Sequence, residues 1–328
     1  MQYTWIMKKA QKRIKSPRAL PVAMILGLAL VATGWYWSEL KGFYTGVLQA
    51  ASVFFVDSST PDILHAAYRD AERGKEKFKV LIVPGHDTAS PGAYFGGLRE
   101  ADLTLAAAKE LVADFLSDKN IEARLARTDQ GYDPELAAYF AEHRTDILSY
   151  RASQTAQMQG YLASGDIASN VLVGHNFAPS EVVIKLYGIN KWANEQGYDL
   201  ILHIHFNDVP RPNRSLPGWP TGFAIYVPEH QFSNAKGSLA IGQAIQKRLL
   251  DLYRASTLPQ EANSPVEDQE LIAIGSNNSL DASSVLIEYS YIYEPLVQQQ
   301  LLRAPSISNM AELTYLGVED FLTKKRYH

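Results

Sequence analysis

The order of hydrophobic and polar positions predicts strands and helices that alternate from Lys79 onward. Apolar runs of strand length occur at Lys79–Val83, Ile121–Leu125, Leu200–Phe206, Gly222–Val227 and Ser284–Glu288. The longer segments between them repeat apolar residues every three or four positions, which is the period of a helix. Helices are predicted at Thr60–Lys79, Glu100–Leu116, Leu239–Tyr253 and Met310–Leu322. Such alternation is typical of the α/β class, in which a mainly parallel, twisted sheet carries helices on both faces.

The alternation is interrupted between residues 130 and 185. Asp133-Pro134-Glu135 is a strong helix start, with an N-cap, a proline in the first turn and an acidic residue beside it. Apolar spacing extends this helix to about Tyr150, and the segment that follows is polar and rich in Ser, Ala and Gly. A connection of this length exceeds an ordinary loop. We therefore expect an insertion that is either a lid or a small subdomain.

The N-terminus predicts a membrane anchor. Residues 1–18 are basic, and Ala19–Trp37 contains no charge. Nineteen helical residues cover about 28 Å, close to the thickness of a hydrocarbon core, and the aromatic cluster at its end is typical of a membrane interface. The positive-inside rule then places the body outside the cytoplasm. A cleaved signal peptide is the alternative, although Thr33–Trp37 is a poor cleavage site.

Residues 38–78 are predicted to form a membrane-proximal linker between the anchor and a catalytic domain at 79–328. The apolar stretch Phe43–Val56 within this linker is too short to span a membrane. We expect it to lie at the membrane surface or to pack on the body.

Charge and cysteine content exclude several classes of function. The chain has 31 basic and 35 acidic residues, and six of the basic ones precede the first acidic residue, Glu39. The rest of the chain has 25 basic and 35 acidic residues, so the body is acidic and unsuited to binding nucleic acid. The chain has no cysteine, which excludes thiol catalysis, disulfides and cysteine-ligated zinc.

Five residues form a candidate catalytic constellation. His86 follows the first predicted strand, and Glu100 opens the next helix. His203 and His205 lie two apart on one strand and therefore share a face, so either one can be a third ligand. Glu288 ends the last apolar strand, where burial would raise its pKa toward that of a general base. Two imidazoles, one carboxylate ligand and one free carboxylate are what a zinc hydrolase requires.

In order and local context these residues resemble the zinc-dependent N-acetylmuramoyl-L-alanine amidases, a family of bacterial cell-wall enzymes. The resemblance spans about residues 79–322, with the insertion outside it. The matching segments are Val80–His86, Gly97–Glu100, Ala126–Asp129, Trp192–Asn194 with Ile204–Asn207, Thr221–Phe223 with Tyr226, and Val285–Glu288. The four segments that hold His86, Glu100, His205 and Glu288 occur in the right order, and together they carry the similarity.

The resemblance implies a role for each candidate residue. His86, Glu100 and His205 correspond to the zinc ligands, and Glu288 corresponds to the catalytic glutamate. The implied reaction is hydrolysis of the amide between N-acetylmuramic acid and L-alanine in peptidoglycan. The predicted anchor places this reaction at the cell membrane, with a single span and the catalytic domain on the extracytoplasmic side. An activating protein partner is a further expectation. The alternative is an inactive relative that binds peptidoglycan or a division partner.

The chain departs from the family pattern at several positions. Asp87 replaces a glycine after the first histidine, where it would support a ligand or compete for zinc. His203 replaces a serine, and a supporting role beside the metal is expected for it. Gly188 stands where an arginine is frequent, and Tyr289–Tyr293 replaces another family pattern, with Glu294 retained.

A narrower hypothesis concerns autoinhibition by the insertion. Some members of this family are held inactive by a helix that covers the metal site. The predicted helix Asp133–Tyr150 carries Glu135, Glu142 and Asp146, which could serve this purpose, and His175 in the same insertion could reach the cleft.

Overall fold

A six-stranded sheet forms the centre of the protein in this computed structural model, which describes residues 57–170, 178–275 and 281–324. The strand order is β4-β1-β7-β10-β8-β9. β4, β1, β7 and β10 are parallel, β8 is antiparallel to β10, and β9 is parallel to β8. The mainly parallel α/β sheet is therefore confirmed. The strands are β1 (Phe78–Pro84), β4 (Ile121–Leu125), β7 (Leu200–Asn207), β8 (Ala224–Pro228), β9 (Val266–Asp268) and β10 (Ser283–Tyr291).

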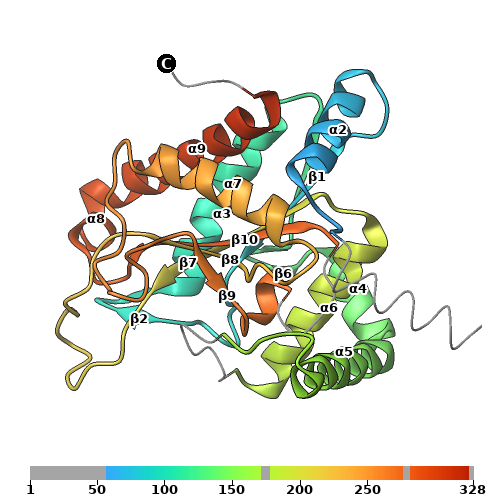
Figure 1. The fold of residues 1–328 in the computed structure, drawn as a ribbon. Helices are drawn as coiled ribbons and strands as arrows, with labels where there is room; N and C mark the ends of the chain where they lie inside the picture. The colour runs from blue at the N-terminus through green and yellow to red at the C-terminus, as the bar shows by residue number, and fades with distance from the viewer. Residues whose placement is uncertain (1–56, 171–177, 276–280, 325–328) are drawn as a thin grey trace, which may run out of the picture. The chain divides into compact units, whose positions relative to one another are not determined.

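Helices cover both faces of this sheet (Figure 1). One face carries α2 (Pro61–Glu72), α3 (Glu100–Leu116), α7 (Ala235–Leu249) and α9 (Gln300–Thr323), with the short α8 (Pro295–Gln298) before α9. The other face carries α4 (Pro134–Glu142), α5 (Arg144–Ser164), α6 (Ser180–Gln196) and the 3-10 helix η1 (Ile272–Ile274). Two short hairpins complete the described elements: β2 (Tyr94–Phe95) with β3 (Leu98–Arg99), and β5 (Arg127–Thr128) with β6 (Gly131–Tyr132).

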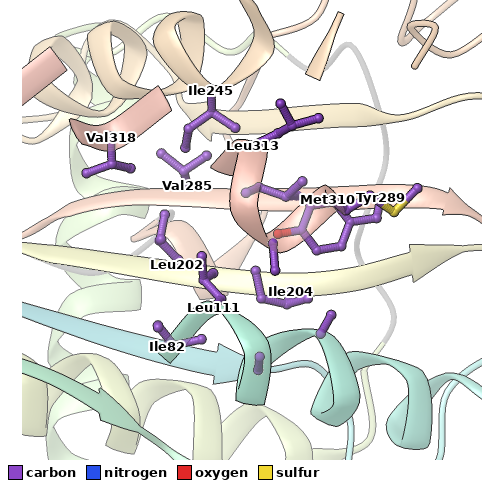
Figure 2. Close-up of a cluster of buried hydrophobic side chains, with 14 of the residues drawn as sticks. Ile82, Leu111, Leu202, Ile204, Ile245, Val285, Tyr289, Met310, Leu313 and Val318 are labelled. Carbon is purple, nitrogen blue, oxygen red and sulfur yellow. The ribbon is translucent and has the colours of Figure 1, made fainter. Parts of the chain in front are cut away.

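The alternation of side chains along each strand separates the two cores. On β1, Val80 and Ile82 point to the α3 face, whereas Leu81 and Val83 point to the α6 face. Figure 2 shows the larger core, where sheet residues meet side chains of α3, α7 and α9. Full burial of one such aliphatic side chain stabilises the fold by about 1.5–3 kcal/mol. The labelled members are Ile82, Leu111, Leu202, Ile204, Ile245, Val285, Tyr289, Met310, Leu313 and Val318.

The helix predicted at Thr60–Lys79 belongs to the body rather than to a linker. Thr60 caps α2 by accepting a hydrogen bond from the Ile63 amide, and the helix ends at Glu72. Leu64 and Tyr68 are buried in the larger core. The predicted linker is thus part of the domain from residue 57 onward. The predicted anchor at residues 19–37 lies outside the described residues, and within the described ranges no helix has the length and hydropathy to cross a membrane.

The insertion contains two helices, α4 and α5, instead of the single helix predicted at Asp133–Tyr150. Both pack on α6, and Gly188 of α6 makes this contact close. A Cβ at Gly188 would lie 2.8 Å from the Phe140 ring. The glycine at position 188, where the family frequently has an arginine, therefore leaves the space that the insertion needs to pack on α6.

Two of the three acidic residues proposed to block the metal site have other partners. Glu135 accepts a hydrogen bond from Arg124 at 2.7 Å, and Asp146 lies 3.0 Å from the His143 ring. The described contacts of these two carboxylates therefore do not support a lid over the metal site. His175 lies outside the described residues.

Candidate active site

His86 lies two residues beyond the end of β1 in a strained turn. Its φ of +62° is rare for a residue with a side chain. The neighbouring Gly85 is held on both sides, because its amide donates to the Ile204 carbonyl at 2.8 Å and its carbonyl accepts from the Thr104 hydroxyl at 2.8 Å. The buried Arg127 donates to the same carbonyl at 3.0 Å. These contacts fix the direction in which the His86 ring leaves the backbone.

Glu100 is the first residue of α3 and stands at the centre of the site. Its Oε2 lies 3.1 Å from Nε2 of His86 and accepts the Ala93 amide at 2.8 Å. Its Oε1 lies 3.0 Å from Nδ1 of His205 and accepts the Phe206 amide at 3.3 Å. Burial opposes ionisation of this carboxyl, but its bonds to the two histidines hold its pKa below the ordinary value. The side chain is therefore a carboxylate at neutral pH.

The three predicted ligands converge. Donor atoms of His86, Glu100 and His205 all lie within 4.8 Å of one another. Two imidazole nitrogens and one carboxylate oxygen are a ligand set that catalytic zinc uses, with a fourth position left for water or substrate. The donor chemistry therefore fits zinc. These are the three residues that the sequence predicted as ligands, and the structure brings them together.

The structure separates the two histidines of β7. His205 contacts Glu100, whereas the His203 ring contacts the backbone of Ala273 and is 1% exposed. Burial first, and then the neighbouring His205, lower the pKa of His203 to about 3, so its imidazole is neutral. His203 is therefore outside the ligand cluster.

Glu288 lies beside this cluster on β10, where it is paired in register with His205 of β7. Its Oε2 is buried and has no hydrogen-bond partner within the described part of the chain. Burial, followed by the nearby charges of Glu100 and Glu261, raises the pKa of Glu288 well above its ordinary value. Glu288 also lines a cavity of about 310 Å³ together with His86 and His205. A carboxyl in this setting can exchange a proton with a molecule bound at the ligand cluster.

Asp87 does not contact the three candidate ligands through its described hydrogen bonds. Its Oδ2 pairs with the Lys185 ammonium of α6 at 2.5 Å and accepts the Tyr132 hydroxyl at 3.2 Å. Its Oδ1 accepts the amides of Ala89 and Ser90. Burial opposes ionisation, but these bonds hold the pKa of Asp87 below its ordinary value. The residue therefore anchors the loop after His86 to α6.

Two glycines that sequence reasoning did not select also define the site. A Cβ at Gly85 would lie 2.3 Å from the His205 ring. A Cβ at Gly92 would lie 2.4 Å from Oε2 of Glu100 and 2.5 Å from the His86 ring. The backbone therefore approaches the ligands at two points where only glycine leaves enough space. The glycine content of the loop was visible in the sequence, but these contacts were not.

A donor cluster and a buried carboxyl at the carboxyl ends of parallel strands are the arrangement expected of a metal-dependent hydrolase. A family model for N-acetylmuramoyl-L-alanine amidase matches residues 80–320. The chain therefore belongs to the N-acetylmuramoyl-L-alanine amidase family, as its motifs predicted, and family membership supports hydrolysis of an amide bond in the cell wall.

Several solved amidase structures are similar to this chain. The N-acetylmuramoyl-L-alanine amidase of Clostridium difficile 630 is 18% identical, with 77% of this chain and 100% of that chain covered and a TM-score of 0.49. The CwlD amidase of Clostridioides difficile, solved with the GerS lipoprotein, is 15% identical, with coverages of 76% and 100% and a TM-score of 0.49. Ami1 of Mycobacterium smegmatis is 15% identical, with coverages of 76% and 98% and a TM-score of 0.47. No curated protein matches the chain.

Proposed function

We propose that this protein is a membrane-anchored zinc hydrolase that cleaves the amide between N-acetylmuramic acid and L-alanine in peptidoglycan. The observation that carries the proposal is the convergence of His86, Glu100 and His205 beside the buried carboxyl of Glu288. An inactive relative would have no need to keep this carboxyl, because burying it without a partner costs free energy.

Each residue has a chemical task in this reaction. His86, Glu100 and His205 would hold zinc, which when bound polarises the scissile carbonyl and lowers the pKa of water. Glu288 accepts a proton from the attacking water and delivers it to the nitrogen of L-alanine as the carbon–nitrogen bond breaks. The burial that raises the pKa of Glu288 suits both steps, because it makes the carboxylate a stronger base toward water than an exposed glutamate is. The products are a carboxylate on the sugar side and a free amine on the peptide.

The full-length protein, purified in detergent, tests this function directly. We expect one zinc ion per chain by elemental analysis and release of peptides that begin with L-alanine from purified peptidoglycan. Labelling of new amino groups, followed by mass spectrometry, identifies the bond that was cut. A protein that contains zinc but releases no such peptide would support the binding role instead.

The proposed location is the cell membrane, with residues 19–37 as a single span and the catalytic domain on the extracytoplasmic side. The uncharged run and its basic N-terminal flank support this orientation. We expect the full-length chain to remain in the membrane fraction after alkaline washing, and a chain that begins at Asp57 to be soluble. Protease added to spheroplasts should digest the body. Recovery of a soluble chain with a new N-terminus near residue 37 would indicate a cleaved signal peptide.

A further inference from the structure

The cavity beside the ligand cluster is larger than the space that a zinc ion and its bound water require. It lies on the α6 face of the sheet, between that helix, η1 and the ends of β1, β7 and β10. Aliphatic and polar side chains both line it, and the volume of about 310 Å³ is in the range of small-ligand pockets. The aliphatic wall includes Val83, Val182, Leu186, Ile189, Ile272 and Leu286.

One buried polar atom in this cavity needs a hydrogen-bond donor. His203 lines the cavity, and its Nε2 has no partner among the residues that the structure describes. Since the ring bonds the Ala273 backbone, and Nε2 is unpaired, that bond belongs to Nδ1. Nδ1 therefore carries the proton that it donates to the backbone, and Nε2 is an acceptor. A buried acceptor without a donor is destabilising, so a ligand N–H that reaches it is favoured.

We propose that this cavity is the subsite for the first residue of the stem peptide, and that Nε2 of His203 accepts the N–H of the peptide bond after L-alanine. This inference rests on the proposed amidase function. It makes His203 a residue that recognises peptide length, because a substrate that ends at L-alanine has no such N–H.

The spacing along β7 supports this assignment. His203 and His205 point to the same face and are two residues apart, which corresponds to about 6.6 Å along a strand. One extended residue of substrate spans up to about 3.6 Å. The difference between these two lengths is about 3 Å, which is the donor–acceptor distance of an N–H···N hydrogen bond. A peptide whose scissile amide lies at the ligand cluster can thus place its next N–H on His203.

The two sides of the scissile bond differ in what can enter the cavity. On the sugar side the first group is a substituted sugar ring within a polymer, which is much bulkier than one amino-acid side chain. On the peptide side the first group is the small methyl of L-alanine, which suits an aliphatic wall. The Lys185–Asp87 pair also lines the cavity and holds α6 against the loop after His86.

Two substrates separate this role from a general effect on catalysis. N-acetylmuramoyl-L-alanine lacks the second N–H, and N-acetylmuramoyl-L-alanyl-D-isoglutamine contains it. For the full-length, zinc-loaded protein we expect His203→Phe to lower kcat/KM about 10-fold for the longer substrate and to leave the shorter one unchanged. His203→Gln retains an acceptor and should recover part of the loss. Equal loss on both substrates, or no loss, would overturn the proposal.

A binding experiment tests the cavity without catalysis. Calorimetric titration of the dipeptide L-alanyl-D-isoglutamine should give weaker binding, by about 10-fold, to Val182→Phe, which fills the cavity from α6, and to His203→Phe. Ser180→Phe adds the same ring at an exposed position of α6 and should bind as the wild type does. Unchanged binding to Val182→Phe would contradict the subsite. If the wild type cleaves neither muramyl substrate, the amidase function fails, and the inference fails with it.

Discussion

Glu288→Gln is expected to lower kcat for cleavage of the muramyl amide by about 10²- to 10⁴-fold, the usual contribution of a general acid–base. Glutamine has the same shape but cannot accept and return a proton. Zinc content should stay at one ion per chain, since Glu288 is outside the cluster of three donors. Steady-state kinetics and elemental analysis of the same preparation measure both quantities.

The stability of this variant provides a second readout. Burial raises the pKa of Glu288 in the folded protein above its value in the unfolded chain. In the metal-free state this group therefore lowers the free energy of unfolding at pH values above the unfolded pKa, and it has no such effect below that pKa. The free energy of unfolding at neutral pH should therefore not decrease in Glu288→Gln. Glu110→Gln makes the same change at an exposed position of α3 and should match the wild type in every measurement. Loss of zinc from Glu288→Gln would instead identify Glu288 as a ligand.

The residues of the site could be predicted because strand ends are predictable. His86 lies two residues beyond the end of β1, and His205 and Glu288 lie within the last residues of the parallel strands β7 and β10. The carboxyl ends of parallel strands meet at one edge of the sheet. Periodicity alone could not separate His203 from His205, because both point to the same face. The choice depends on α3, because its first residue, Glu100, contacts His205, whereas the His203 ring contacts the backbone of Ala273.

The parts of the fold that were missed lack a local signal. The first turns of α9 expose Leu301 at 89% and contain Pro305, so they show neither an apolar stripe nor uninterrupted helix formers. The α2 helix was predicted, but the surface that buries Tyr68 comes from distant segments. The edge strand β9 has only three residues, which is too short for a periodicity.

Contacts between distant groups were also invisible in the sequence. Glu261 lies in the irregular segment after α7, and its buried carboxylate accepts hydrogen bonds from Asn207, Tyr226 and Tyr291. Glu261 contributes, after burial and Glu100, to the raised pKa of Glu288. This network depends on how the chain folds back over the sheet, which no local pattern specifies.

Gly92→Ala is expected to weaken zinc binding by about 10- to 100-fold, as changes that displace metal ligands commonly do. The new Cβ would lie 2.4 Å from Oε2 of Glu100 and 2.5 Å from the His86 ring. Both ligands would have to move, since the Ala93 amide holds Glu100 from the adjacent position. Competition with a chromophoric chelator measures the affinity, and amidase activity at limiting zinc should fall with it.

Gly97→Ala separates this displacement from backbone strain. Gly92 and Gly97 have φ values of +73° and +84°, so alanine costs about 1–2 kcal/mol at either position. A Cβ at Gly97, however, has no atom within 4 Å. The two variants should therefore show a similar loss of stability in the metal-free state, but only Gly92→Ala should bind zinc more weakly. Equal zinc affinities would mean that the ligands adapt to the added methyl group, and that the close approach of Gly92 does not set the geometry of the site.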